Sequence, residues 1–162
     1  MSVQIVFTLV LFLHNLFTVA WIGGLIALAV TVLPSVKQVL GMGPQTKKLM
    51  DAIQKRHSVL VYVSMVGLVL TGLLLGNRSA SFQGLFSLNN AYSAALSAKH
   101  ILVLAMIAIS LYRSLALGRR QGPPTPAHEK LSAGLLLLNL GLGIVVLLLS
   151  GLTTALGAAP VV

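Results

Sequence analysis

A histidine stands inside an uncharged, apolar stretch near the start of the chain. Residues 3–36 contain no charged side chain, and His14 lies well within them, followed by Asn15. A polar group at such a position is costly in lipid and therefore needs a specific role. Neutral imidazole is a good ligand for haem iron, copper and zinc, so His14 is a candidate metal ligand. The alternative is an imidazole that hydrogen-bonds a neighbouring helix.

A second pair of candidate ligands, Lys99 and His100, opens a later apolar run. At a rise of 1.5 Å per residue, His14 lies about 33 Å along the helix axis from the basic end of its run. His100 lies about 28 Å from the basic end of its own run. Both are therefore expected in the same half of a helical bundle. Consecutive helical residues point about 100° apart, so only one of the pair can face the bundle centre. We expect His100, because Lys99 must first lose a proton to coordinate a metal; Lys99 stays the alternative.

Further residues are predicted around the same site. Trp21 and Gly24 follow His14 in the first run, and Ser150 lies at a similar height in the last one. His57 and His128 fall at the opposite, basic end and are expected as solvated interface residues.

The missing residue types exclude several kinds of chemistry. There is no cysteine, which removes disulfides, thiolate metal sites and covalent haem attachment. Asp51 and Glu129 are the only carboxylates, and both lie in the charged connections, so paired-carboxylate catalysis is excluded. No phosphate-binding glycine loop, nucleophile elbow or zinc-protease motif is present.

The elements that hold these residues are membrane helices. Of the 162 residues, 57% are hydrophobic and only 8% are charged, far from the composition of a soluble domain. Charge-free runs long enough to cross about 30 Å of hydrocarbon predict helices over about 3–36, 58–77, 96–117 and 131–156. The first run is too long for one upright span, and Pro34 is expected to mark its inner end. Short interfacial segments are expected over about 45–55 and 79–93.

These elements predict an all-α fold, an integral membrane antiparallel four-helix bundle that forms a single transmembrane domain over residues 1–162. Nine Lys and Arg residues flank one side of the helices and two flank the other. The positive-inside rule therefore places both termini on the extracytoplasmic side of a multi-pass protein of the cell membrane. The net charge of +9 lies in these loops, so it indicates lipid contact and no nucleic-acid binding.

The order of these features resembles the CopD family and its relative HemJ, which are small four-helix membrane proteins. The resemblance rests on His14 with Trp21-Ile22-Gly23-Gly24, on Thr71-Gly72, and on Tyr92, Leu96 and Lys99. CopD-like proteins are associated with copper uptake, and HemJ-like proteins with haem b and protoporphyrinogen oxidation. The resemblance implies functional roles for His14 and Lys99. Two departures are His100 directly after the lysine, and Asn139 where such families often carry an acidic residue.

The favoured interpretation is a membrane-embedded b-type haem protein, with His14 and either His100 or Lys99 as axial ligands. Such a protein transfers electrons or oxidises a small hydrophobic substrate, either quinone-like or porphyrinogen-like, as a haem-dependent oxidoreductase. Its candidate partners are the lipid bilayer, quinone, a redox partner protein and a second copy of the chain. The alternative is copper transport or resistance, for which only Met65 and Met106 supply soft sulfur ligands within the spans. A third class is a non-catalytic membrane subunit.

The predicted orientation can be tested by labelling with an impermeant thiol reagent in intact cells, because the chain has no cysteine of its own. A cysteine introduced at Ser81 should react, and one introduced at Thr125 should not. The opposite pattern would show that the orientation is reversed.

Overall fold

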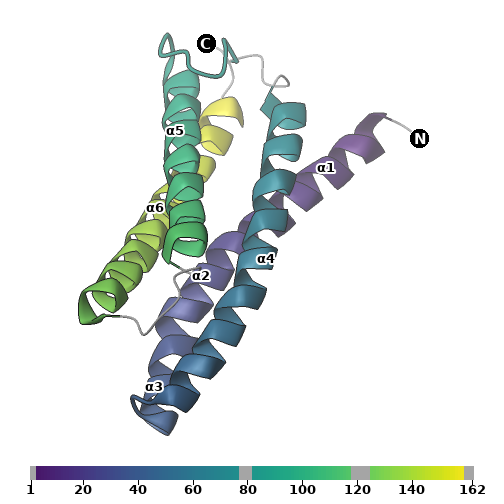
Figure 1. Cartoon of the computed structure of the whole chain (residues 1–162). Helices are drawn as coiled ribbons and strands as arrows, with labels where there is room; N and C mark the ends of the chain where they lie inside the picture. Colours follow the sequence, from purple (N-terminus) through teal and green to yellow (C-terminus); the bar gives the residue numbers. More distant parts are fainter. Residues whose placement is uncertain (1–2, 77–81, 118–124, 159–162) are drawn as a thin grey trace. The chain divides into compact units, whose positions relative to one another are not determined.

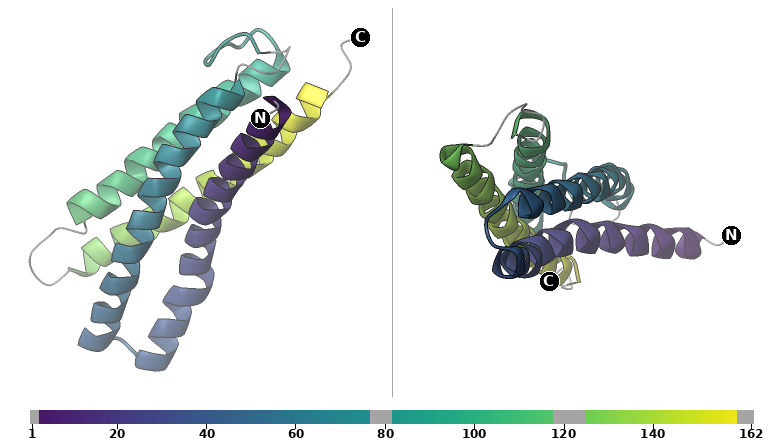
Figure 2. Two further views of the ribbon diagram at one scale, coloured as in Figure 1. Left: turned by 90° about the vertical axis from the view of Figure 1, so that its right-hand side faces the viewer. Right: turned by 60° about the horizontal axis from the view of Figure 1, so that its bottom comes forward.

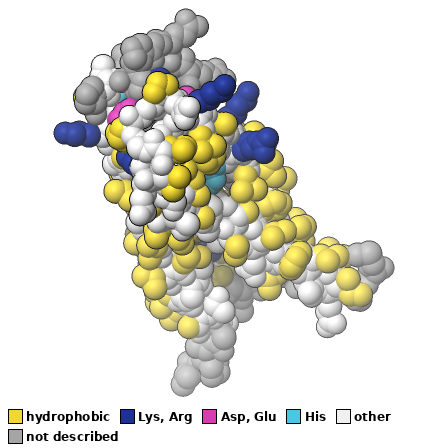
Figure 3. Space-filling view, turned by 90° about the horizontal axis from the view of Figure 1, so that it is seen from below, with side chains coloured by type: hydrophobic (Ala, Val, Ile, Leu, Met, Phe, Trp, Pro, Cys, Tyr) yellow, Lys and Arg dark blue, Asp and Glu magenta, His cyan; other side chains and the backbone are white. Residues whose placement is uncertain are grey.

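Four long helices make up most of the chain in a computed structural model that describes residues 3–76, 82–117 and 125–158. Four helical stretches are long and apolar enough to cross a membrane: Val3–Leu40, Pro44–Gly76, Ala91–Leu117 and Ala127–Gly157. The described residues contain no β-strand. Hydrophobic side chains cover much of the visible surface (Figure 3), as lipid contact requires. The all-α, multi-pass membrane fold is confirmed, whereas the orientation of the termini stays a prediction.

The first stretch is one continuous helix that changes its winding along its length. Its parts are α1 (Val3–Thr18), the π-helical η1 (Val19–Gly23), α2 (Gly24–Ile26), the π-helical η2 (Ala27–Val32) and α3 (Leu33–Leu40). The helix was expected to end at about residue 36, with Pro34 at its inner end, but it continues to Leu40 and stops at Gly41, which has a φ of 65°. Proline has no N–H to donate to the preceding turn. The wider π-helical winding of η2 precedes Pro34 and absorbs that change in hydrogen-bond register.

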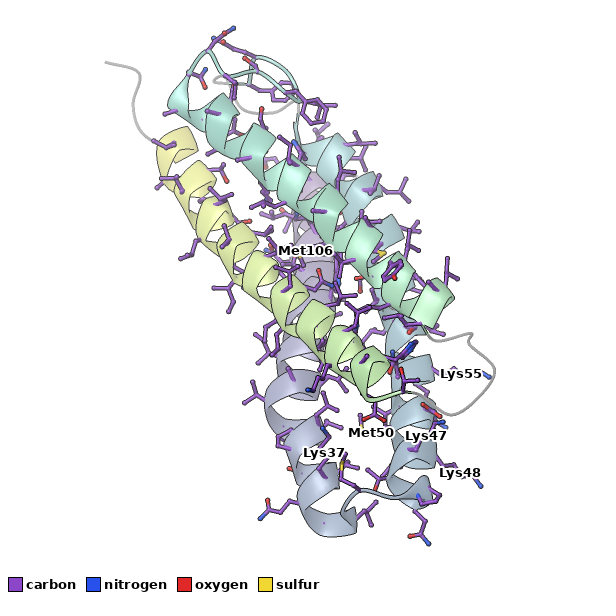
Figure 4. The ribbon with its side chains drawn as sticks, turned by 60° about the vertical axis from the view of Figure 1, so that its left-hand side comes forward. Lys37, Lys47, Lys48, Met50, Lys55 and Met106 are labelled. Carbon is purple, nitrogen blue, oxygen red and sulfur yellow. The ribbon has the colours of Figure 1, made fainter. Side chains whose placement is uncertain are left out.

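The second helix, α4 (Pro44–Gly76), includes a segment that was expected to lie separately on the membrane surface. Residues 45–55 form the first three turns of α4 because no glycine or proline interrupts the sequence between Pro44 and Gly67. At the start of α4, the Thr46 hydroxyl donates a hydrogen bond of 2.8 Å to the Gly41 carbonyl. The lysines of this region, Lys37, Lys47, Lys48 and Lys55, lie around the connection between α3 and α4 (Figure 4).

The other two membrane helices are α5 (Ala91–Leu111), extended by the π-helical η3 (Tyr112–Leu117), and α6 (Pro126–Ala158). Both begin five residues earlier than predicted, because polar side chains before each helix hydrogen-bond its first turn. Asn90 Oδ1 accepts from the Ser93 N–H at 2.6 Å, and Thr125 Oγ1 accepts from the His128 N–H at 3.3 Å. In the segment predicted over 79–93, residues 82–90 are a loop and 91–93 belong to α5. Its residues 79–81 lie outside the described part of the chain.

The chain divides into two compact units, Met1–Gly72 and Leu73–Val162. In the first unit the helix Val3–Leu40 runs antiparallel to α4, and in the second α5 runs antiparallel to α6 (Figures 1 and 2). Helices α5 and α6 pack closely, and Asn139 Nδ2 donates a hydrogen bond of 2.9 Å to Ser110 Oγ between them. The interpretation of residues 1–162 as a single domain stays a prediction.

In the first unit, ring side chains of one helix lie against glycines of the other. The Phe17 ring occupies the space where a Cβ atom of Gly67 would stand. A Cβ atom at Gly72 would lie 3.7 Å from His14 Cε1, and one at Gly24 would lie 2.7 Å from His57 Cε1. His57 was expected as a solvated interface residue, but its ring packs against the opposite helix. Glycine permits this approach because it has no side chain.

These contacts predict different outcomes for two alanine substitutions in the same helix. Gly67→Ala should destabilise the hairpin by about 1–3 kcal/mol, the usual cost of overpacking, because its Cβ atom displaces the Phe17 ring. Gly72→Ala makes the same change in helix propensity but meets only an ordinary van der Waals contact, so it should be tolerated.

Unfolding of the purified variants in mixed micelles measures both effects. The double variant Phe17→Ala/Gly67→Ala should be less destabilised than the sum of its single variants, because the steric conflict is gone. Equal stability of Gly67→Ala and Gly72→Ala would contradict the close packing of Phe17.

Candidate functional site

His14 is held by a hydrogen bond between the two helices of the first unit. Its Nδ1 lies 2.8 Å from Thr71 Oγ1, which in turn lies 2.6 Å from the Gly67 carbonyl oxygen. A carbonyl only accepts, so the Thr71 hydroxyl proton is donated to Gly67. Thr71 Oγ1 therefore accepts from His14, and the imidazole proton resides on Nδ1.

This arrangement fixes the chemistry of the His14 ring. A neutral imidazole protonated at Nδ1 carries its lone pair on Nε2. Histidine ligands of metals are commonly oriented in this way, with the second ring nitrogen donating to a protein oxygen. The two hydrogen bonds that link His14 to Thr71 and Thr71 to Gly67 therefore leave the lone pair on Nε2, where it can act as a metal ligand or proton acceptor. The hydrogen bond also serves the structural alternative, because it ties α1 to α4.

Trp21 and Gly24 lie further along the same helix as His14. Trp21 is 1% exposed and belongs to the π-helical η1, and such segments are frequent at functional sites. Gly24 follows η1 and receives the His57 ring. The structure thus brings the predicted residues His14, Trp21 and Gly24 into one hairpin, together with Thr71 and His57.

Lys99 and His100 belong to the second unit, where His100 binds the loop that precedes its own helix. Its Nδ1 lies 3.3 Å from the Leu85 carbonyl oxygen, to which it donates. Its ring also meets the Phe86 ring edge-on, with the centroids 6.2 Å apart. The hydroxyl of Ser97, one turn earlier, lies 2.9 Å from the Ser87 carbonyl oxygen. His100 therefore fastens the loop 82–90 to α5, and its Nε2 carries the lone pair when the ring is neutral.

The Ser150 hydroxyl finds its hydrogen-bond partner within its own helix. Ser150 Oγ donates a hydrogen bond of 2.8 Å to the Val146 carbonyl one turn earlier. Such back-bonding is a usual way for serine to remain in an apolar helix. A role for Ser150 at a cofactor stays a prediction, as does the pairing of His14 with His100 or Lys99, which belong to the other unit.

No group of three or more His, Cys, Asp or Glu side chains gathers in the described residues. A metal bound at His14 would therefore not be held by three such side chains of the described residues. Cu(I) accepts soft thioether and imidazole donors.

The family model of copper resistance protein D (CopD) matches residues 51–153. The chain belongs to the CopD family. No curated protein and no solved structure matches the sequence. The match to CopD includes Thr71, Lys99, His100 and Ser150, but it begins after the first membrane helix. His14 lies outside the matched residues, and its importance rests on its hydrogen bond with Thr71.

Thr71 is the contact of His14 that sequence reasoning did not assign. Thr71→Val keeps the shape of the side chain and removes the hydroxyl. We expect it to cost about 0.6 kcal/mol, the average for a hydrogen bond between membrane helices, and to release the imidazole proton from its fixed position on Nδ1. Thr71→Ser retains the hydroxyl and should behave like the original protein.

Nitrogen-15 NMR of histidine-labelled protein distinguishes the two neutral tautomers of His14, with a His14→Gln sample to assign its signals. An Nδ1-protonated ring that is unchanged in Thr71→Val would show that Thr71 does not control the tautomer.

Proposed function

We propose that this CopD-family protein binds copper at His14 and passes it across the membrane. The observation that carries the proposal is the hydrogen bond from His14 Nδ1 to Thr71, which presents Nε2 as the basic nitrogen inside an apolar hairpin. The family description names copper resistance, and imidazole is a good copper ligand. Copper is the cargo in this proposal.

A soft sulfur donor on α4, the helix that contacts His14, favours Cu(I) as the form that is carried. Met65 lies on α4, two turns before Thr71, and is 7% exposed. Its thioether sulfur is a ligand type that selects Cu(I). A pathway with few, weak ligands suits transfer better than storage, because a transported ion must leave each position as well as enter it.

The haem interpretation receives less support. Within Met1–Gly72 the other histidine is His57, which packs against Gly24, ten residues along the helix from His14. Ten residues correspond to about 15 Å of α-helix, so one iron cannot bind both imidazoles. The description of the CopD family names no haem, quinone or oxidoreductase activity. Haem b, an electron-transfer role, a redox partner and an oligomer accordingly stay predictions.

The proposal is tested with purified protein in liposomes that contain a fluorescent Cu(I) indicator. His14→Ala should lower the rate of Cu(I) entry at least about tenfold, the lower end of what disturbing the surroundings of a metal ligand costs. The matched control His128→Ala removes an imidazole at the start of α6 and should leave the rate unchanged.

An absorption spectrum of the same preparation separates copper from haem. Protein that carries one haem per chain and admits no copper would refute the proposal in favour of the haem interpretation. Copper entry that His14→Ala leaves unchanged would show that His14 is not a ligand.

A further inference from the structure

Two buried polar side chains of the first unit have no hydrogen-bond partner among the described residues. They are Trp21, through its Nε1–H, and Ser64, through its hydroxyl. Trp21 is 1% exposed and Ser64 is 0% exposed. The hydroxyl of Tyr62, half a turn from Ser64 on α4, is a third such group. Leaving a polar group unsatisfied in a buried position costs about 1–3 kcal/mol, so three together in one hairpin require an explanation.

Ser64 differs in this respect from most other hydroxyl side chains of the membrane helices. The usual solution is to donate to the carbonyl one turn earlier. Thr8, Thr18, Ser58, Thr71, Ser150 and Thr154 all do so, over 2.6–2.9 Å. Ser64 does not, although its position in α4 offers the same carbonyl. Its buried hydroxyl therefore lacks the usual hydrogen bond to its own helix.

The register of the hairpin places Trp21 and Ser64 in the same layer. In the first helix Trp21 lies between Phe17 and Gly24, and in α4 Ser64 lies between His57 and Gly67. Phe17 packs on Gly67 and His57 packs on Gly24, so the layer of Trp21 and Ser64 lies between these two contacts.

Several polar residues of each helix share one face. His57, Ser64 and Thr71 follow one another at intervals of seven residues in α4, which is nearly two whole turns. His14 and Trp21 are separated by the same interval in the first helix. Since His14 contacts Thr71 and His57 contacts Gly24, these faces are directed toward each other.

The chemistry of the unsatisfied atoms indicates what fills this layer. The indole N–H only donates, so it needs an acceptor, and hydrocarbon side chains offer none. A hydroxyl both donates and accepts. Water meets both requirements, and buried water molecules typically make about three hydrogen bonds to such groups.

We propose that the facing surfaces of the first helix and α4 enclose a hydrated path from His14 to His57, and that copper crosses the first unit along it. The identity of the cargo rests on the proposed function, whereas the hydration does not. Between its two ends the path covers ten residues of the first helix and fourteen of α4, or about 15–21 Å at 1.5 Å per residue, which is at least half of a hydrocarbon core of roughly 30 Å. An imidazole binds Cu(I) at each end, and water with the Ser64 hydroxyl solvates the ion between them.

The hydration is tested by thiol labelling, because the chain has no cysteine of its own. Ser64→Cys replaces a hydroxyl by a thiol of similar size. The matched control Val66→Cys lies at the same depth of α4 but is 61% exposed on the apolar surface of the protein. A thiol ionises in water and not in lipid, so Ser64→Cys should react with Ag⁺ at least about tenfold faster than Val66→Cys. Equal or slower reaction at Ser64→Cys would overturn the hydrated path.

A second measurement uses the unmodified protein, because Trp21 is its only tryptophan. Its fluorescence should be more intense in D₂O than in H₂O and should be quenched by aqueous Cs⁺. Emission that responds to neither, and that is quenched only by brominated lipids, would place Trp21 in a dry environment and refute the path.

Different results would refute the hydrated path and the transport of copper. If modified Ser64→Cys protein still carries copper at the original rate, the route is wrong but the proposed function stands. If Ser64→Cys reacts rapidly and the original protein carries no copper, the path is hydrated but the proposed function is wrong. Both parts hold if reaction at Ser64→Cys is fast, is slowed by bound Cu(I), and abolishes copper entry.

Discussion

Hydrocarbon offers no hydrogen-bond partner, and every polar side chain in this chain's membrane helices is placed under that constraint. Most hydroxyl groups satisfy it locally by bonding to their own backbone, as Ser150 does. A few polar groups satisfy it across a hairpin, where they join two helices: His14 with Thr71, and Asn139 with Ser110. Trp21 and Ser64 do neither among the described residues. The same constraint therefore separates groups that hold the fold together from groups that remain available to a ligand or to water.

The glycines decide where these groups can meet. A larger residue at Gly67 would exclude the Phe17 ring, and one at Gly24 would collide with the His57 ring. These contacts fix the register of the first helix against α4, and the register in turn fixes which polar residues share a layer. The π-helical turns of η1 and η2 contribute as well, because they change the direction in which residues after Thr18 point. Packing of apolar rings thus positions the polar residues, although it provides no chemistry itself.

The four membrane spans could be predicted from the sequence because charge-free length alone determines them. The predicted ends of the helices were less accurate, because local hydrogen bonds extend α5 back to Ala91 and α6 back to Pro126. His14 stood out as a polar residue in an apolar run. Its contact with Thr71, and that of His57 with Gly24, depend on how two helices are rotated and paired, which hydropathy does not encode. The seven-residue spacing of His57, Ser64 and Thr71 was the available signal for a polar face.

The scarcity of acidic residues bears on how such a protein would handle a cation. Asp51 and Glu129 are the only carboxylates of the chain, and they lie near the starts of α4 and α6. An ion bound by imidazole and thioether groups keeps its positive charge, because those ligands are neutral. A retained charge is disfavoured away from water, so binding to such ligands is weaker than at a carboxylate or thiolate site. On the proposed path, weak binding between two imidazoles with water in the layer between them favours release over retention. A chain built this way is better suited to moving copper than to storing it.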